Sequence, residues 1–266
     1  MTDLEQHLRA RVETGAKLLV PYVMAGAPTP NTSADAIARL GSVADAVEIG
    51  LPYSDPIMDG PVIAAAAQRA IAAGVGPLTA LDLSVATDIP RIAMTYYNPI
   101  HRLGEAEFCA RLIDAGYAGL IVPDLPHEES ASLRTACAER GVAWIPLVAP
   151  TSSDERVAAV AESATGFVYA VSTLGVTGVR ESLSARAERV VSACRAHTDL
   201  PVLVGIGVSS PDQAVQACAW ADGVVIGTAV VRLLGDEGVD PAVDFLAAVR
   251  AALDGLQTAA PSAPRG

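Results

Sequence analysis

The sequence predicts an α/β fold, namely a (β/α)8 TIM barrel with extra helices. The 266 residues are 51% hydrophobic, which is enough for one large core. Short apolar runs alternate with longer helical runs rich in Ala, Arg and Glu, and there are eight of the apolar runs. Barrels of about 250 residues commonly form one domain. We therefore expect a single domain over residues 1–256 and a disordered tail, rich in Ala, Pro and Ser, over 257–266.

The predicted strands are apolar with little interruption, as in strands buried on both faces of a sheet. They are Leu18–Met24, Ala46–Gly50, Arg91–Thr95, Gly119–Val122, Ala143–Val148, Gly166–Val171, Pro201–Gly205 and Gly223–Ile226. Eight strand–helix units can form a closed barrel or a doubly wound sheet. We favour the barrel because the count is even and no Gly-x-Gly-x-x-Gly turn follows the first strand.

The predicted helices begin at capping residues, Pro or Gly, and several end near Gly. Six of them connect strands: Asn31–Leu40, Gly104–Ala115, Glu129–Arg140, Asp154–Ser163, Ser182–His197 and Pro211–Ala219. An extra helix is expected after the second strand at Pro61–Ala73, followed by a short helix at Leu78–Thr87.

Composition excludes several classes of function. The net charge of -12 argues against binding to nucleic acid or to an anionic membrane. The N-terminus lacks the apolar segment of a secretion signal, and the other apolar runs are too short and broken to span a membrane. Cys109, Cys137, Cys194 and Cys218 are widely spaced, so we expect buried, reduced thiols and a cytoplasmic protein.

Two carboxylates near the end of the second strand are candidate catalytic groups, because barrel active sites lie at the C-terminal ends of strands. If Glu48 points into the barrel mouth, desolvation raises its pKa and lets it give and take protons near neutrality. Asp59 lies in an Asp-Gly-Pro turn. Two alternatives stay open: Glu48 could be satisfied by a buried partner, and Asp59 could serve its turn alone.

Glycines after the last strands predict a phosphate site. Gly207 follows the seventh strand, Gly227 ends the eighth, and Thr228 supplies a hydroxyl before a short helix. A further segment with glycines at both ends, 175–178, follows the sixth strand. Backbone N–H groups and a helix N-terminus can hold a phosphate without a lysine, so an acidic protein can bind an anionic substrate in this way.

Several mechanisms receive little support. Lys17 is the only lysine, and it lies at the entry to the first strand, which argues against a Schiff-base aldolase. No two of the four histidines have metal-ligand spacing, so we expect no metal site. His101, His127 and Asp124 follow neighbouring strands, which keeps a metal-assisted aldolase as an alternative. No Gly-x-Ser-x-Gly elbow of a hydrolase is present.

Together these segments resemble the tryptophan synthase α chain family. The resemblance spans roughly Lys17 to Leu234, and its most specific part is the spacing of Ser54-Asp55-Pro56 and Asp59-Gly60-Pro61. The remaining matches are Pro21-Tyr22, Ala25-Gly26, Pro28, Glu48-Ile49-Gly50-Leu51-Pro52-Tyr53, Met94-Thr95-Tyr96-Tyr97-Asn98-Pro99, Pro123-Asp124-Leu125-Pro126, Gly166-Phe167-Val168-Tyr169, Gly175-Val176-Thr177-Gly178 and the two glycine turns.

The resemblance implies a carbon–carbon lyase of tryptophan biosynthesis. It would cleave indole-3-glycerol phosphate to indole and glyceraldehyde 3-phosphate by retro-aldol chemistry, without metal or cofactor. Glu48 matches the general acid/base, and Asp59 matches the carboxylate that binds the indole N–H. The other implied roles are ring packing by Tyr22, Met94 and Leu147, placement of Glu48 by Tyr169, closure of a lid by Thr177, and phosphate binding by Gly178, Gly207, Gly227 and Thr228.

The resemblance also implies a partner, a pyridoxal-phosphate β chain that receives indole through a tunnel in an α2β2 complex. The sequence departs from the family pattern at three places, of which the first two flank the edge that would face the β chain and the third keeps a hydroxyl, so that little change is expected from it. Ala27 replaces a usual acidic residue, the helix between Gly74 and Pro90 is short, and Thr228 stands where Ser is common. The alternatives are a stand-alone lyase that releases free indole, a catalytically silent activator of a β chain, and another phosphate-binding barrel lyase or isomerase of the same pathway.

Overall fold

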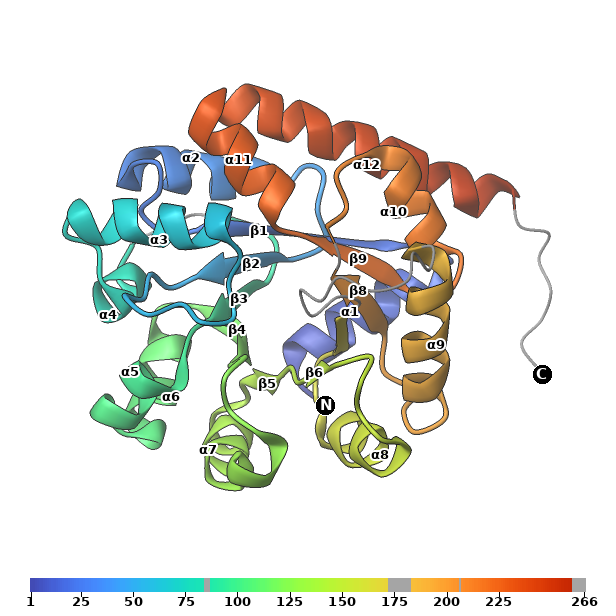
Figure 1. The fold of residues 1–266 in the computed structure, drawn as a ribbon, viewed down its shortest axis with the longest axis horizontal. Coiled ribbons are helices and arrows are strands. Elements are labelled where there is room, and N and C mark those ends of the chain that lie inside the picture. Colours follow the sequence, from blue (N-terminus) through green and yellow to red (C-terminus); the bar gives the residue numbers. More distant parts are fainter. Residues whose placement is uncertain (84–86, 172–182, 206, 260–266) are drawn as a thin grey trace.

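The computed structural model describes residues 1–83, 87–171, 183–205 and 207–259. Within these ranges the strands form one parallel sheet in the order β5-β4-β3-β2-β1-β9-β8-β7-β6, and helices surround it (Figure 1). The strands are β1 (Leu18–Met24), β2 (Val47–Gly50), β3 (Arg91–Met94), β4 (Tyr117–Ile121), β5 (Ala143–Trp144), β6 (Leu147–Val148), β7 (Val168–Val171), β8 (Val202–Gly205) and β9 (Gly223–Ile226).

The ring of strands is completed at residues 143–148. The sequence predicts one strand there, and this is wrong: the segment divides into β5, which pairs with β4, and β6, which pairs with β7. Ile145 N still donates to Leu120 O at 3.0 Å, whereas Pro146 O accepts from Tyr169 N at 3.1 Å. The division falls at Pro146 because proline has no N–H to offer a neighbouring strand. The predicted barrel is confirmed.

The predicted helices are present with shifted ends. They are α2 (Pro30–Leu40), α3 (Pro61–Ala72), α4 (Pro77–Leu81), α6 (Glu105–Asp114), α7 (Ala131–Arg140), α8 (Asp154–Ser163), α9 (Leu183–Arg195), α10 (Pro211–Cys218) and α11 (Thr228–Asp236). The largest difference is α4, which is shorter than predicted; residues 84–86 lie outside the described ranges. The elements without a counterpart in the prediction are α1 (Asp3–Glu13), α5 (Tyr97–Leu103), the 3-10 turn η1 (His127–Glu129) and α12 (Val239–Ala259).

The predicted tail begins too early, because α12 continues to Ala259. This helix buries Leu246, Val249 and Leu253 and packs against α2, α10 and α11. A helix already formed and packed over several turns extends at little cost through a few polar residues. The rest of the predicted tail, 260–266, lies outside the described ranges. No helix in those ranges is long and apolar enough to cross a membrane.

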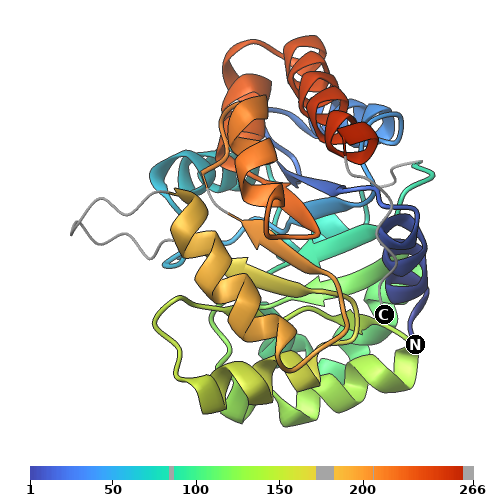
Figure 2. The ribbon, with the colours of Figure 1, turned by 90° about the vertical axis from the view of Figure 1, so that its right-hand side faces the viewer.

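Helix α1 lies across the end of the barrel where the strands begin (Figure 2). Leu4 and Leu8 are fully buried and join the cluster of inward-facing side chains from the strands, such as Leu18 and Phe167. Thr2 caps the N-terminus of this helix: its hydroxyl accepts from Glu5 N at 3.2 Å and donates to Thr165 O at 2.8 Å. The N-terminal end of the barrel is therefore filled with apolar side chains.

A buried carboxylate fixes the start of β2. Asp45 is 4% exposed, and its carboxylate accepts from Leu19 N at 2.8 Å, from Arg11 Nε at 2.7 Å and from an Arg250 guanidinium nitrogen at 3.1 Å. A charge buried this deeply needs such paired donors. The two ion pairs tie α1 and α12, and the main-chain hydrogen bond ties β1, to the entry of β2, three residues before Glu48.

The four cysteines are free and buried, as predicted. Each belongs to a different helix: Cys109 to α6, Cys137 to α7, Cys194 to α9 and Cys218 to α10. The Cys109 and Cys137 sulfur atoms lie 3.7 Å apart where α6 packs on α7. These thiols contribute to the packing of the outer layer.

Candidate active site

A cavity of about 380 Å³ lies at the C-terminal end of the barrel. It brings together seven of the predicted site residues: Tyr22, Glu48, Asp59, Met94, Leu147, Tyr169 and Gly227. They come from six strands or strand ends and from the turn after β2, so residues distant in sequence meet at one opening. The position agrees with the general location of active sites in this fold.

Glu48 points into the cavity from β2. It is 1% exposed and lies in register between Tyr22 on β1 and Ile92 on β3. Its neighbours Val47 and Ile49 belong to the outer layer of the core, so strand alternation turns Glu48 inward. Burial, and secondly the charge of nearby Asp59, raise the pKa of Glu48 to about 8.

The Glu48 carboxyl is not held in an ion pair by the described residues. Its buried Oε2 atom has no hydrogen-bond partner among them. This observation argues against the alternative in which a buried partner satisfies the side chain. A carboxyl group with a pKa near 8 is mostly protonated at neutral pH, so it can donate its proton and regain it.

Asp59 is half-buried and lies in the turn between β2 and α3. Its backbone N donates to Pro56 O at 3.0 Å, while its Oδ2 accepts from the Tyr96 hydroxyl at 3.1 Å. That hydroxyl in turn accepts from Met58 N at 3.0 Å, and the Tyr53 ring stacks on Tyr96 at a centroid distance of 5.1 Å. Burial raises the pKa of Asp59, and the Tyr96 hydrogen bond opposes that effect. The backbone therefore serves the turn while the carboxylate lines the cavity.

Tyr96 is the residue that sequence reasoning missed. It belongs to the segment after the third strand that carries part of the resemblance, but nothing local indicates that it contacts Asp59, 37 residues away. The ring is buried, at 4% exposure. Its hydroxyl stabilises the ionised form of Asp59, because a hydrogen bond to a carboxylate favours the charged state.

Two tyrosines complete the inner wall. Burial, and then the nearby carboxylates, raise the pKa of both Tyr22 and Tyr169, so both phenols are neutral at physiological pH. Glycines make room for their hydroxyl groups: a Cβ atom at Gly50 would overlap the Tyr22 hydroxyl, and one at Gly205 would overlap the Tyr169 hydroxyl. These two glycines are a second feature that the sequence did not assign to the site.

The predicted phosphate residues are only partly gathered. Gly227 lines the cavity and immediately precedes α11, which places the N–H groups of a nine-residue helix beside it. Gly207 and Thr228 are exposed and outside the residues that line the cavity. Thr177 and Gly178 lie outside the described residues.

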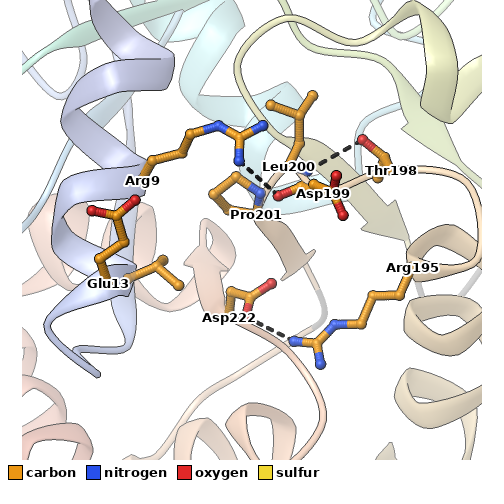
Figure 3. Close-up of a pocket in the computed structure, with 9 residues that line it drawn as sticks. Arg9, Glu13, Arg195, Thr198, Asp199, Leu200, Pro201 and Asp222 are labelled. Carbon is orange, nitrogen blue, oxygen red and sulfur yellow. Dashed lines mark hydrogen bonds and ion pairs between the residues drawn. The ribbon is translucent and has the colours of Figure 1, made fainter. Parts of the chain in front are cut away.

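A second cavity of about 380 Å³ lies at the opposite end, where the strands begin (Figure 3). Two of its charged side chains are already engaged: Arg195 pairs with Asp222 at 2.7 Å, and Arg9 donates to the main-chain oxygen of Asp199 at 3.1 Å. Lys17 also lies at this end and donates to Ala221 O at 2.7 Å. Because these groups precede β8, β9 and β1, they form part of the stabilising face of the barrel.

Potential metal ligands are dispersed in the part of the chain that the structure describes. No group of three or more His, Cys, Asp and Glu side chains there could hold a metal ion. Asp124, a member of the suggested metal set, instead accepts a hydrogen bond from Tyr97 N at 2.9 Å.

Comparison with known proteins places this geometry in a family. The family model described as tryptophan synthase alpha chain matches residues 8–259. The tryptophan synthase alpha chain of a Synechocystis species is 48% identical over 230 residues, covering 84% of this chain and 87% of the relative. That of Streptomyces coelicolor is 44% identical and covers 90% of both chains.

Solved structures agree with the sequence comparisons. A structure of Mycobacterium tuberculosis tryptophan synthase superimposes with a TM-score of 0.87 at 38% identity, covering 95% of this chain and 98% of the other. Tryptophan synthase subunit alpha from Legionella pneumophila gives a TM-score of 0.86 at 29% identity, covering 96% and 99%. With a family match over nearly the whole length and a barrel whose mouth holds Glu48 and Asp59, this chain belongs to the tryptophan synthase alpha chain family.

Proposed function

We propose that the chain cleaves indole-3-glycerol phosphate to indole and glyceraldehyde 3-phosphate, as a lyase of tryptophan biosynthesis. One observation carries the assignment of roles. The Glu48 carboxyl is buried, faces the cavity, has a pKa raised to about 8, and shares that cavity with a second carboxylate, Asp59.

The reaction needs a proton donor and acceptor at one position. Protonated Glu48 gives its proton to C3 of the indole ring, which leaves a cation over C2 and the ring nitrogen. The bond from C3 to the side-chain carbinol carbon then breaks, and its electron pair returns to the ring. The carbinol hydroxyl becomes an aldehyde and its proton goes to Glu48, which is restored to its starting form.

The second carboxylate has a different environment and a different role. Asp59 accepts the ring N–H and stabilises the positive charge that develops on the ring, and the Tyr96 hydroxyl keeps it ionised. Enzymes often give two carboxyl groups separate functions by placing the acid in an apolar environment and the charge stabiliser in a more polar one.

The remaining cavity walls position the substrate. Met94, Leu147 and Tyr22 contact the indole ring, and Tyr169 orients Glu48. The phosphate binds near Gly227, where the N-terminus of α11 offers unpaired N–H groups. Gly178, Gly207 and Thr228 complete the phosphate site in this assignment, and Thr177 belongs to the segment that covers Asp59.

A Glu48→Gln variant tests the division of labour. Glutamine keeps the shape of the side chain but cannot exchange the proton, so indole release falls to background. Binding of glycerol 3-phosphate, measured by calorimetry, stays within about threefold of the parent chain because the phosphate site lies across the barrel mouth. Equal loss of release and of phosphate-ligand binding would contradict the assigned roles.

A β chain is the proposed partner, in an α2β2 assembly that works in the cytoplasm. Two large apolar side chains beside the cavity support a protein contact, because Ile57 is 79% exposed and Met58 is 46% exposed. Indole release by the purified chain, with and without a tryptophan synthase β chain, distinguishes the possibilities. Strong stimulation supports the partner, a high rate alone supports a stand-alone lyase, and absence of any turnover supports a silent activator.

A further inference from the structure

A side cavity of about 310 Å³ adjoins the active-site cavity. It lies beside the ends of β4 and β6, next to α8, and its walls are mainly apolar, including Val122, Trp144, Pro146 and Val160. None of these four lines the active-site cavity. The volume exceeds what a small ring substituent needs, and the walls suit an apolar one.

Leu147 stands between the two cavities. It lines both of them, together with Met58, Pro123 and Arg156. Strand alternation turns Ile145 and Leu147 toward the barrel interior, whereas Trp144 and Pro146 lie on the side-cavity face. The Leu147 side chain is half-buried and joins the interior cluster at its edge.

The position of this wall follows from the order of strands. Glu48 is on β2 and Leu147 is on β6, and three strands, β3, β4 and β5, lie between them on this side of the ring. The phosphate end, at Gly227 after β9, lies in the other direction from β2. A substrate with C3 at Glu48 and its phosphate near Gly227 therefore extends its benzene ring toward Leu147.

We propose that Leu147 is the residue that determines which benzene-ring substituents the site accepts, because it closes the active-site cavity off from the apolar side cavity. This inference rests on the proposed function. Shortening Leu147 joins the two cavities and admits indole-3-glycerol phosphates that carry a small apolar group, such as chlorine, at ring position 5 or 6. These positions are the farthest from the ring nitrogen and C3.

The test compares selectivity in matched variants. The ratio of kcat/KM for the 5-chloro and 6-chloro substrates to that for the unsubstituted substrate is measured for the parent chain, Leu147→Ala, Leu147→Val and Met94→Ala. Met94 lines the active-site cavity and not the side cavity, so it controls for general loosening. For at least one chlorinated substrate we expect this ratio to rise about tenfold or more in Leu147→Ala and by less in Leu147→Val. A change of about tenfold is the size of effect that one small group has in an apolar pocket.

Binding provides a readout that does not depend on turnover. Analogues that lack the side-chain hydroxyl groups cannot be cleaved, so their binding can be measured alone. For each variant, the affinity for the chlorinated analogue is divided by the affinity for the unsubstituted analogue. A change below about threefold in both Leu147 variants, or an equal rise in Met94→Ala, would overturn the inference. If the parent chain releases no indole from the unsubstituted substrate, the proposed function fails, while the binding ratios still decide the role of Leu147.

Discussion

The raised pKa of Glu48 predicts a pH-dependent cost to folding that glutamine removes. Glu48 binds its proton more tightly in the folded chain, where the pKa is about 8, than in the unfolded chain, where it is near 4.5. Above pH 4.5 the unfolded state has released a proton that the folded state keeps. The stability of the parent chain therefore falls as pH rises toward 8, and the loss levels off above 8.

The magnitude follows from the size of that pH interval. Each pH unit within it corresponds to about 1.4 kcal/mol, so raising the pH from about 5.5 to about 8 destabilises the parent chain relative to Glu48→Gln by about 3 kcal/mol. The packing cost of the glutamine side chain does not depend on pH and cancels in this comparison. Urea denaturation of both chains at several pH values gives the difference in free energy of unfolding.

The exposed residue Glu107 on α6 provides a matched control. Glu107→Gln makes the same chemical change at an exposed site, so its free-energy difference from the parent chain stays nearly constant with pH. A constant difference for Glu48→Gln over the same pH range would refute the argument that burial holds a proton on this carboxyl group.

Three further predictions test the site. First, kcat/KM for indole release falls about tenfold per pH unit above about pH 8, because only protonated Glu48 can protonate the ring; a flat profile to about pH 9.5 would contradict this. Second, Tyr96→Phe lowers kcat/KM about tenfold and raises the pKa of Asp59, since the hydrogen bond to the carboxylate is lost; activity profiles over acidic pH measure both effects. Third, Gly50→Ala destabilises the chain by about 1–3 kcal/mol through overlap with the Tyr22 hydroxyl. In denaturation experiments a Tyr22→Phe background relieves part of that loss, and purely additive effects would argue against the contact.

Glu48 shows how much of a side chain's position the local sequence pattern can predict. Its place in an apolar strand indicated burial, and strand alternation then left two orientations. The paired registers of β1, β2 and β3, together with the anchoring of Asp45 at the entry of β2, decide for the inward one. The sequence could not supply this choice, because it depends on which face of the strand the surrounding helices cover.

At the predicted fifth strand, the local sequence pattern gave a wrong prediction. An apolar run over 143–148 satisfied the local criterion for one strand, yet its two halves pair with different neighbours. The barrel must close between β4 and β7, and Pro146 is where the pairing changes. Similarly, the polar and charged N-terminus gave no sign that Leu4 and Leu8 of α1 would fill the bottom of the barrel.

By itself, the sequence determined the alternation of strands and helices, the family resemblance and the two carboxylates, because periodicity, turn residues and short motifs are properties of neighbouring residues. Only the tertiary structure decided that Tyr96 holds Asp59, that Gly50 and Gly205 make room for tyrosine hydroxyls, and that Leu147 lines two adjoining cavities. These relations join segments that are far apart in the chain, and they exist only once the closed barrel has brought the strand ends to the same mouth.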